Sequence, residues 1–184
     1  MNRAAHADVP LDREVFMRTL VRELATSPET VVGLEEAPGY LSLVGQSVGS
    51  QINDTCPRAL SVRRLTREQV ADVLVDLTQR ARGDFHLVSQ DDERIVLGSR
   101  SCPFAEKVLG RESRCTMTSN TFGTIAAQNP GCARVELRET IARGHERCRV
   151  TAHLRPYADL DAEPSREYFG DAATTRPGPA GPGV

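Results

Sequence analysis

Five cysteines are the residues of this sequence best suited to chemistry, and they stand at positions 56, 102, 115, 132 and 148. Residues 1–10 lack the apolar stretch of a signal peptide. We therefore expect the protein in the cytoplasm, where disulfides are rare, and the odd number of cysteines agrees with that. Metal ligation, thiol chemistry and plain burial remain as roles for each cysteine.

The spacing of the cysteines does not by itself choose among these roles. Twelve residues separate Cys102 from Cys115, 32 separate Cys115 from Cys148, and no CxxC pair is present. The usual signature of a zinc or iron–sulfur site is thus lacking. A Cys–His nucleophile pair needs a base within hydrogen-bond reach, and the turn expected at His145 makes that geometry unfavourable toward Cys148. No phosphate-binding glycine loop, HExxH or GxSxG motif is present, so we predict no enzyme active site.

Length, charge and hydropathy limit the kinds of partner that we expect. The chain has 184 residues, 39% of them hydrophobic, and a net charge of -2. That length fits one domain with tails, and the charge gives no basic footprint for nucleic acid. No apolar run reaches the roughly 20 residues that span a bilayer. We therefore expect neither nucleic acid nor membrane as a partner.

Helical periodicity appears over residues 11–25, 40–60, 66–82 and 116–129. In the third segment, Thr66 and Gln69 form a capping box, and Gly83 supplies a stop. In the second, Gly45 and Gly49 lie on the apolar stripe, where each costs about 1 kcal/mol relative to alanine. A tight helix crossing explains these two glycines better than contact with a ligand.

Alternating patterns predict four strands. Residues 85–89 and 94–97 flank a polar turn and form a hairpin, while residues 133–141 and 148–154 form a second antiparallel pair. The expected fold class is α+β, with an antiparallel sheet packed against several helices. We assign residues 1–10 to a flexible N-terminus, residues 11–155 to a single sensor or output-type domain, and residues 156–184 to a mostly disordered tail rich in proline and glycine toward its end.

These elements can bring three cysteines together. Cys102 ends a strand, Cys115 precedes a helix and Cys148 begins a strand on its apolar face, so the three can meet at one edge of the sheet. A helix N-terminus also favours the thiolate that a metal requires.

Three motifs carry a resemblance to a known family: RSCPF at 100–104, CTMTSNTFG at 115–123 and ETIARGHERCRV at 139–150. Together they resemble the methanogen output domain family of signal-transduction proteins, and the likeness extends upstream through LTREQVADVLVDL at 65–77. The strand–RGHxxCR–strand ending is also similar to vinyl-reductase-type small-molecule sensor domains. That second resemblance implies a structural zinc, held in part by Cys148, beside a pocket for a small ligand.

The resemblance implies Cys102, Cys115 and Cys148 as metal ligands, because the strand before the turn offers no cysteine here. For the fourth position we rank Cys132 first, and the alternatives are Cys56, His145, Glu139 or water. We expect zinc, with an iron–sulfur cluster as the alternative.

The expected function is a stand-alone regulatory domain that binds a small molecule. Its signal would pass to a regulatory protein partner or through a homodimer. A thiol redox switch on the same cysteines is the rival hypothesis.

Overall fold

The computed structural model describes residues 37–81, 83–102, 109–110, 112–155 and 165–170. The chain divides into two units, Met1–Tyr40 and Leu41–Val184, and the second holds nearly all of the described residues. The predicted helix at 11–25 and the N-terminal segment lie outside the described residues. The described elements, in chain order, are α2 (Ala37–Ala59), α3 (Arg67–Arg80), β1 (His86–Gln90), β2 (Arg94–Ser99), α4 (Ser113–Gln128), β3 (Cys132–Glu139), the 3₁₀ helix η3 (Ile141–Arg143), β4 (Cys148–His153) and β5 (Ser165–Phe169).

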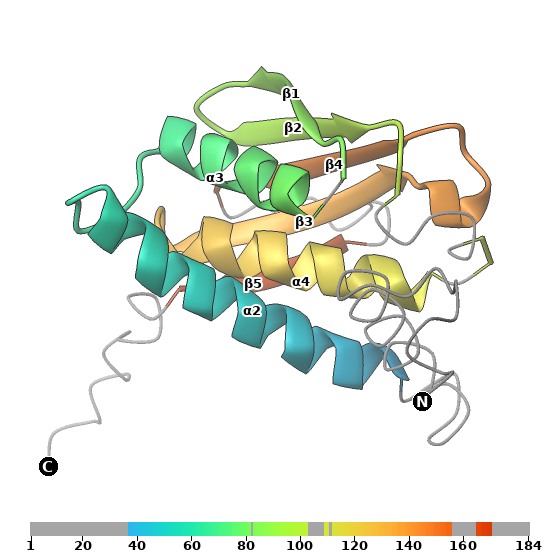
Figure 1. Cartoon of the computed structure of the whole chain (residues 1–184), viewed down its shortest axis with the longest axis horizontal. Coiled ribbons are helices and arrows are strands. Elements are labelled where there is room, and N and C mark those ends of the chain that lie inside the picture. Colours follow the sequence, from blue (N-terminus) through green and yellow to red (C-terminus); the bar gives the residue numbers. More distant parts are fainter. Residues whose placement is uncertain (1–36, 82, 103–108, 111, 156–164, 171–184) are drawn as a thin grey trace, which may run out of the picture. The chain divides into compact units, whose positions relative to one another are not determined.

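The five strands form one antiparallel sheet in the order β1-β2-β4-β3-β5, and α3 and α4 cover one of its faces (Figure 1). Both predicted strand pairs are confirmed, as is the α+β class. Ile95, Val135 and Val150 point from neighbouring strands into the core and are almost fully buried. Alternating apolar residues thus place the helix layer on this face of the sheet.

The fifth strand was missed by sequence analysis. Ser165–Phe169 lies inside the segment assigned to the C-terminal tail, yet it pairs with β3 along its whole length. Only Tyr168 in this edge strand is buried, so no alternating pattern marks it. The ring of Tyr168 lies against Gly123 of α4, and its hydroxyl is 3.0 Å from Ser119 Oγ. The domain therefore continues at least to Gly170, while the predicted tail at 175–184 lies outside the described residues.

The start of α3 is confirmed in detail. The Thr66 hydroxyl accepts from the Gln69 N–H at 3.3 Å, and the Gln69 side chain accepts from the Thr66 N–H at 2.9 Å. This capping box satisfies two of the N–H groups that a helix start leaves without partners. The apolar stripe that follows buries Val70 and Leu74 against the sheet.

The two glycines of α2 mark a close helix crossing, as predicted. A Cβ atom on Gly45 would lie 2.6 Å from the Met117 carbonyl oxygen, and one on Gly49 would lie 2.8 Å from Thr124 Cβ. The Thr121 hydroxyl also reaches the Gly45 carbonyl at 3.1 Å. The small residues let α2 and α4 approach at backbone distance, which explains their place on the apolar stripe. In the described ranges, no helix is both long and apolar enough to cross a membrane.

Candidate functional site

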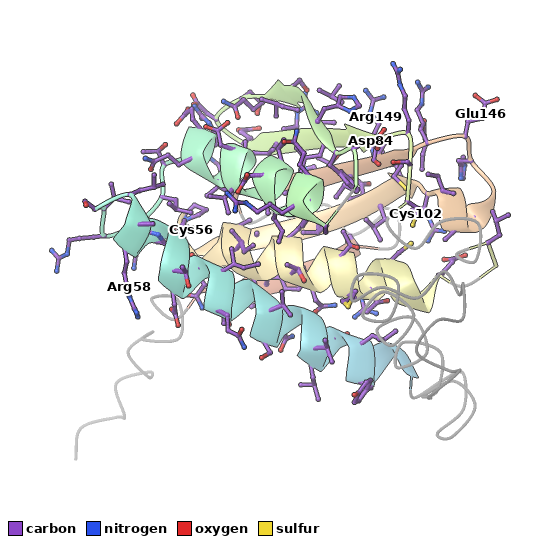
Figure 2. All side chains as sticks on the ribbon, viewed as in Figure 1. Cys56, Arg58, Asp84, Cys102, Glu146 and Arg149 are labelled. Carbon is purple, nitrogen blue, oxygen red and sulfur yellow. The ribbon has the colours of Figure 1, made fainter. Side chains whose placement is uncertain are left out.

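Three of the predicted site residues come from three elements that meet at one end of the sheet. Cys148 opens β4 and pairs with Ser99, the last residue of β2. Cys102 follows Ser99 by three residues, and Cys115 lies in the first turn of α4. Figure 2 places Cys102 at this end of the sheet and Cys56 toward the opposite end. The three therefore lie near one end of the sheet, although β2 ends three residues before Cys102, and Cys115 lies inside the first turn of α4 rather than before it.

The three thiols are close enough to interact electrostatically. Burial is the largest cause, followed by negative charge on Cys148 and on Cys102, and together they raise the pKa of Cys115 to about 12. Burial also raises the pKa of Cys148. The Ile141 N–H donates a hydrogen bond to Cys148 Sγ at 3.4 Å, and this bond partly opposes the rise. Without a counter-cation the cluster favours neutral thiols, because several thiolates in one half-buried place repel one another.

The three cysteines lie in one region of the structure but are not arranged as metal ligands. Within the part of the chain that the structure describes, no three His, Cys, Asp or Glu side chains are arranged at once to hold a metal ion. The donor chemistry nevertheless suits a soft metal, since thiolates select zinc, copper(I) and iron–sulfur clusters. None of the three forms a disulfide, and all three are half-buried. Metal binding at this place would need the three thiols to move closer to one another.

Cys132 does not belong to this cluster. It is the first residue of β3, whereas Cys148 lies near the other end of that strand, because its neighbour Arg149 pairs with Glu139. Glu139 follows Cys132 by seven residues, which at about 3.3 Å per residue is roughly 23 Å. The sulfur of Cys132 instead faces the Leu154 carbonyl oxygen at 3.9 Å. The structure thus separates the first-ranked fourth ligand from the other three.

The alternative fourth ligands are engaged elsewhere. Cys56 packs against the hydrophobic core from α2. His145 Nδ1 lies 3.1 Å from the Thr140 carbonyl oxygen, and the Glu139 carboxylate pairs with Arg147 at 3.0 Å. Water, or an oxygen ligand that sequence analysis did not consider, is left for the fourth position.

The turn between β3 and β4 connects the start of β4, which carries Cys148, to the start of α4, which carries Cys115. The Thr140 hydroxyl accepts from the Arg143 N–H at 3.3 Å, and Gly144 at φ 87° ends the 3₁₀ turn in the left-handed region that favours glycine. The Arg143 guanidinium then bonds Glu112 at 2.9 Å, just before α4. Sequence analysis missed this ion pair because the two residues are far apart in the chain.

A second polar group on the opposite face of the sheet was also missed. Glu136 alternates with the core residue Val135 along β3, yet it is itself only 4% exposed. Its carboxylate pairs with Arg138 at 3.0 Å and with His153 at 3.3 Å. Burial would raise the pKa of Glu136, but these two partners outweigh it and hold the pKa below its usual range. The group is internally satisfied, which is the pattern of a structural ion pair.

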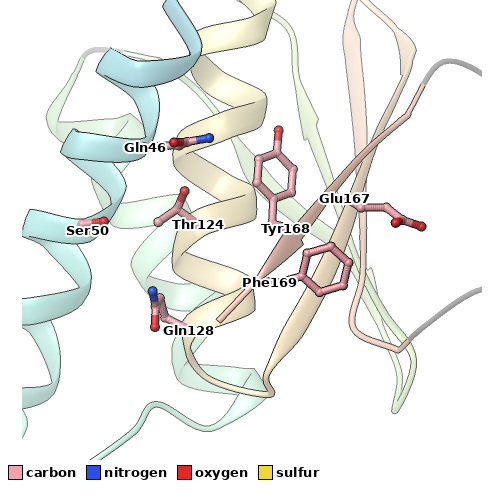
Figure 3. Close-up of a pocket in the computed structure, with 7 residues that line it drawn as sticks. All are labelled: Gln46, Ser50, Thr124, Gln128, Glu167, Tyr168 and Phe169. Carbon is pink, nitrogen blue, oxygen red and sulfur yellow. The ribbon is translucent and has the colours of Figure 1, made fainter. Parts of the chain in front are cut away.

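A pocket of about 350 Å³ lies between α2, α4 and β5 (Figure 3). Its walls are mostly amides and hydroxyls, with one carboxylate and two aromatic rings: Gln46, Ser50, Thr124, Gln128, Glu167, Tyr168 and Phe169. Gln128 follows Cys115 by thirteen residues of one helix, or about 20 Å at 1.5 Å per residue. This pocket therefore lies toward the end of α4 away from Cys115, and the pocket beside the metal that the second resemblance implied stays a prediction.

The raised pKa of Cys115 predicts a loss of stability at alkaline pH in metal-free protein. The thiol is protonated in both states below its ordinary value of 9.0, so its full contribution is present there. Between 9.0 and about 12 the unfolded chain releases a proton that the folded chain keeps. The free energy of unfolding then falls, by at most about 1.4 kcal/mol per pH unit for one group.

Urea unfolding of wild type and Cys115→Ala at about pH 8 and about pH 10.5 measures this contribution. The stability advantage of wild type should shrink at the higher pH, and the other titrating groups cancel in the difference. An advantage that stays constant would show that Cys115 does not titrate as described.

The chain was compared with known families and structures. It matches the model of a family described as methanogen output domain 1 over residues 20–153. Among solved structures it matches the phenol-responsive sensory domain of the transcription activator PoxR, determined with phenol, at a TM-score of 0.58 and 13% identity. That match covers 74% of this chain and 73% of the other, and at this identity it shows a shared fold alone. No curated protein matches the sequence. Neither match names the vinyl-reductase-type sensors, so that resemblance stays a prediction.

Proposed function

The chain belongs to the methanogen output domain 1 family, and on that premise we propose that it is a regulatory sensor or output domain of signal transduction with a cysteine-ligated metal site, and not an enzyme. The single observation that carries the metal site is the meeting of Cys102, Cys115 and Cys148 at one end of the sheet. In this proposal the three cysteines hold zinc, with an iron–sulfur cluster as the alternative. Water or an oxygen ligand completes the set.

The electrostatics of the cluster support a cation there. When no metal is bound, negative charge on one thiol raises the pKa of its neighbour. A bound divalent cation would instead lower the pKa of each thiol. Zinc would supply a structural cross-link between the loop after β2, the start of α4 and the start of β4. The Ile141 N–H, already directed at Cys148 Sγ, would remain as a donor to the bound thiolate.

Metal analysis of the purified full chain tests the proposal. We expect about one zinc per chain in wild type, which is the content of one tetrahedral structural site. Replacing all three cysteines of the cluster by serine should remove the metal. The matched control is Cys56→Ser with Cys132→Ser, which also alters free, half-buried thiols but leaves the cluster intact. Metal retained by the triple variant, or lost from the control, would refute this ligand set.

A thiol redox switch uses the same residues and makes a different prediction. Thiolates attack oxidants, so a pKa near 12 leaves Cys115 a poor redox thiol at neutral pH. Thiol titration separates the two hypotheses. Cysteines that react only after a chelator is added support the metal site, and cysteines that react at once in the untreated protein support the switch.

We also propose that the domain binds a small molecule in the pocket between α2, α4 and β5. Its volume of about 350 Å³ falls in the range of ligand sites. The exposed ring of Phe169 offers a stacking surface, and the amides and hydroxyls offer hydrogen bonds. The structural neighbour is described as phenol-responsive, so an aromatic compound with a hydroxyl group is the reasonable first probe.

Calorimetric titration with phenol, and with cyclohexanol as the non-aromatic comparison, tests the pocket. Phe169→Ala should weaken phenol binding severalfold because it removes the stacking surface. Leu109→Ala is the control, since Leu109 is similarly exposed, at 57% against 63%, and does not line the pocket. If the two variants bind phenol with equal affinity, phenol does not bind in this pocket.

A further inference from the structure

Asp84 stands just before β1 and reaches across the end of β2. Its Oδ1 accepts hydrogen bonds from the backbone N–H of Arg100 at 2.9 Å, from the N–H of Ser101 at 2.9 Å and from the Ser99 hydroxyl. Figure 2 shows Asp84 at the same end of the sheet as Cys102. One carboxylate oxygen thus binds the three residues that immediately precede Cys102.

These hydrogen bonds lie just beyond the last strand pair of β2. Pairing between β2 and β4 ends at Ser99 and Cys148, so nothing in the ladder fixes the next two residues. Asp84 supplies that restraint, and the Cys102 Cα follows the Ser101 Cα by about 3.8 Å. This side chain therefore restrains the chain where it leaves β2, up to the residue before Cys102.

We infer that Asp84 is a positioning residue of the proposed metal site: by binding the backbone of residues 99–101, it holds Cys102 where its thiolate can join those of Cys115 and Cys148. The inference rests on the proposed function. Partners outside the ligand shell commonly change metal affinity about 10- to 100-fold when they are removed.

The role is one of geometry rather than of charge. Burial raises the pKa of Cys148, and the negative charge of Asp84 raises it further, so the carboxylate does not serve to activate that thiol. The hydrogen bonds to Asp84 need only an acceptor oxygen, which an asparagine side chain also provides. Asparagine at this position should therefore keep the metal affinity, while alanine should weaken it.

Asp91 offers a matched control at the opposite end of the same hairpin. Its Oδ1 accepts from the N–H groups of Glu93 at 2.9 Å and Arg94 at 3.0 Å. Removing it deletes the same kind of turn-stabilising carboxylate, and Ser99 lies five residues of strand away from Arg94. Asp91→Ala should thus cost stability without reaching the cysteines.

The experiment measures cobalt(II) binding to the full chain, followed by the thiolate-to-cobalt absorption bands, in wild type, Asp84→Asn, Asp84→Ala and Asp91→Ala. We expect Asp84→Ala to bind at least about tenfold more weakly and with altered bands. Asp84→Asn and Asp91→Ala should match wild type. Unchanged binding by Asp84→Ala would overturn the inference. An equal loss in Asp84→Asn would also overturn it, because the carboxylate charge or direct ligation would then be required.

A second readout keeps the inference separate from the proposed function. If wild type binds no cobalt, the metal site itself fails. The alkylation rate of Cys102 in chelator-treated protein, located by peptide mass spectrometry, still tests the positioning role. Asp84→Ala should speed this modification severalfold over wild type, and Asp91→Ala should not. An equal rate in all variants would mean that Asp84 does not hold the chain before Cys102.

Discussion

Removing the metal from the wild-type protein with a chelator is expected to lower its melting temperature by about 8–16 °C. A ligand present at a thousand times its dissociation constant stabilises the folded state by about 4 kcal/mol. In a domain of this size, each kcal/mol corresponds to roughly 2–4 °C. The proposed metal would join the chain after β2, the start of α4 and the start of β4, and so add to contacts such as the Arg143–Glu112 pair. Differential scanning calorimetry with and without chelator measures the shift.

The control for this prediction is the variant with serine at positions 102, 115 and 148. It has no thiolates to bind a soft metal, so the chelator should leave its melting temperature unchanged within about 2 °C. Restoring zinc to chelated wild type should recover the original value. A shift of equal size in both proteins, or none in wild type, would contradict a structural metal at this place.

Gly123→Ala is expected to lower the free energy of unfolding by about 2 kcal/mol. A Cβ atom at this position would overlap the ring of Tyr168, which lies buried between α4 and the rest of β5. Overpacking of this kind costs about 1–3 kcal/mol or more, and the better helix propensity of alanine returns only about 1 kcal/mol. Chemical denaturation of the purified variant gives the value.

A double-mutant comparison shows whether the ring is the cause. Once Tyr168→Ala has removed the ring, the added Cβ of Gly123→Ala has no atom to displace. The double variant should therefore be at least as stable as Tyr168→Ala alone. A further loss in the double variant would mean that the added methyl group disturbs α4 itself, and the close contact between α4 and β5 would not explain the glycine.

Local signals account for the part of the fold that sequence analysis predicted. The capping box at Thr66 and Gln69, the alternation in the two strand pairs and the glycines of α2 are each readable within a few residues. The position of Cys102, Cys115 and Cys148 followed from the same signals, since strand ends and helix starts gather at sheet edges. That these three thiols form a metal site stays a proposal.

The missed features depend on contacts between distant residues. β5 is held by one buried tyrosine and by pairing with β3, neither of which leaves a periodic trace in the sequence. Asp84 gains its partners only when β1 and β2 pair, and Glu136 gains His153 only when β3 and β4 pair. Cys132 was ranked as a ligand because it is near the cluster in the sequence, but its position at the far end of β3 removes it.

Helix α4 connects the two proposed sites. Its first turn carries Cys115, and its second half carries Thr124 and Gln128 of the pocket. Between them, Ser119 and Asn120 are almost fully buried and bond to β5 and α2. In the proposed function, a ligand that shifts α4 would therefore act on the helix that also carries Cys115.

Zinc K-edge X-ray absorption on the purified wild-type protein tests the central claim most directly, because it reports the atoms bound to the metal. The account predicts three sulfur ligands at about 2.3 Å and one lighter oxygen or nitrogen ligand at about 2.0–2.2 Å. In the variant with serine at 102, 115 and 148 the sulfur shell should disappear. A wild-type metal bound only by oxygen and nitrogen, or a sulfur shell that survives those three substitutions, would contradict the site described here.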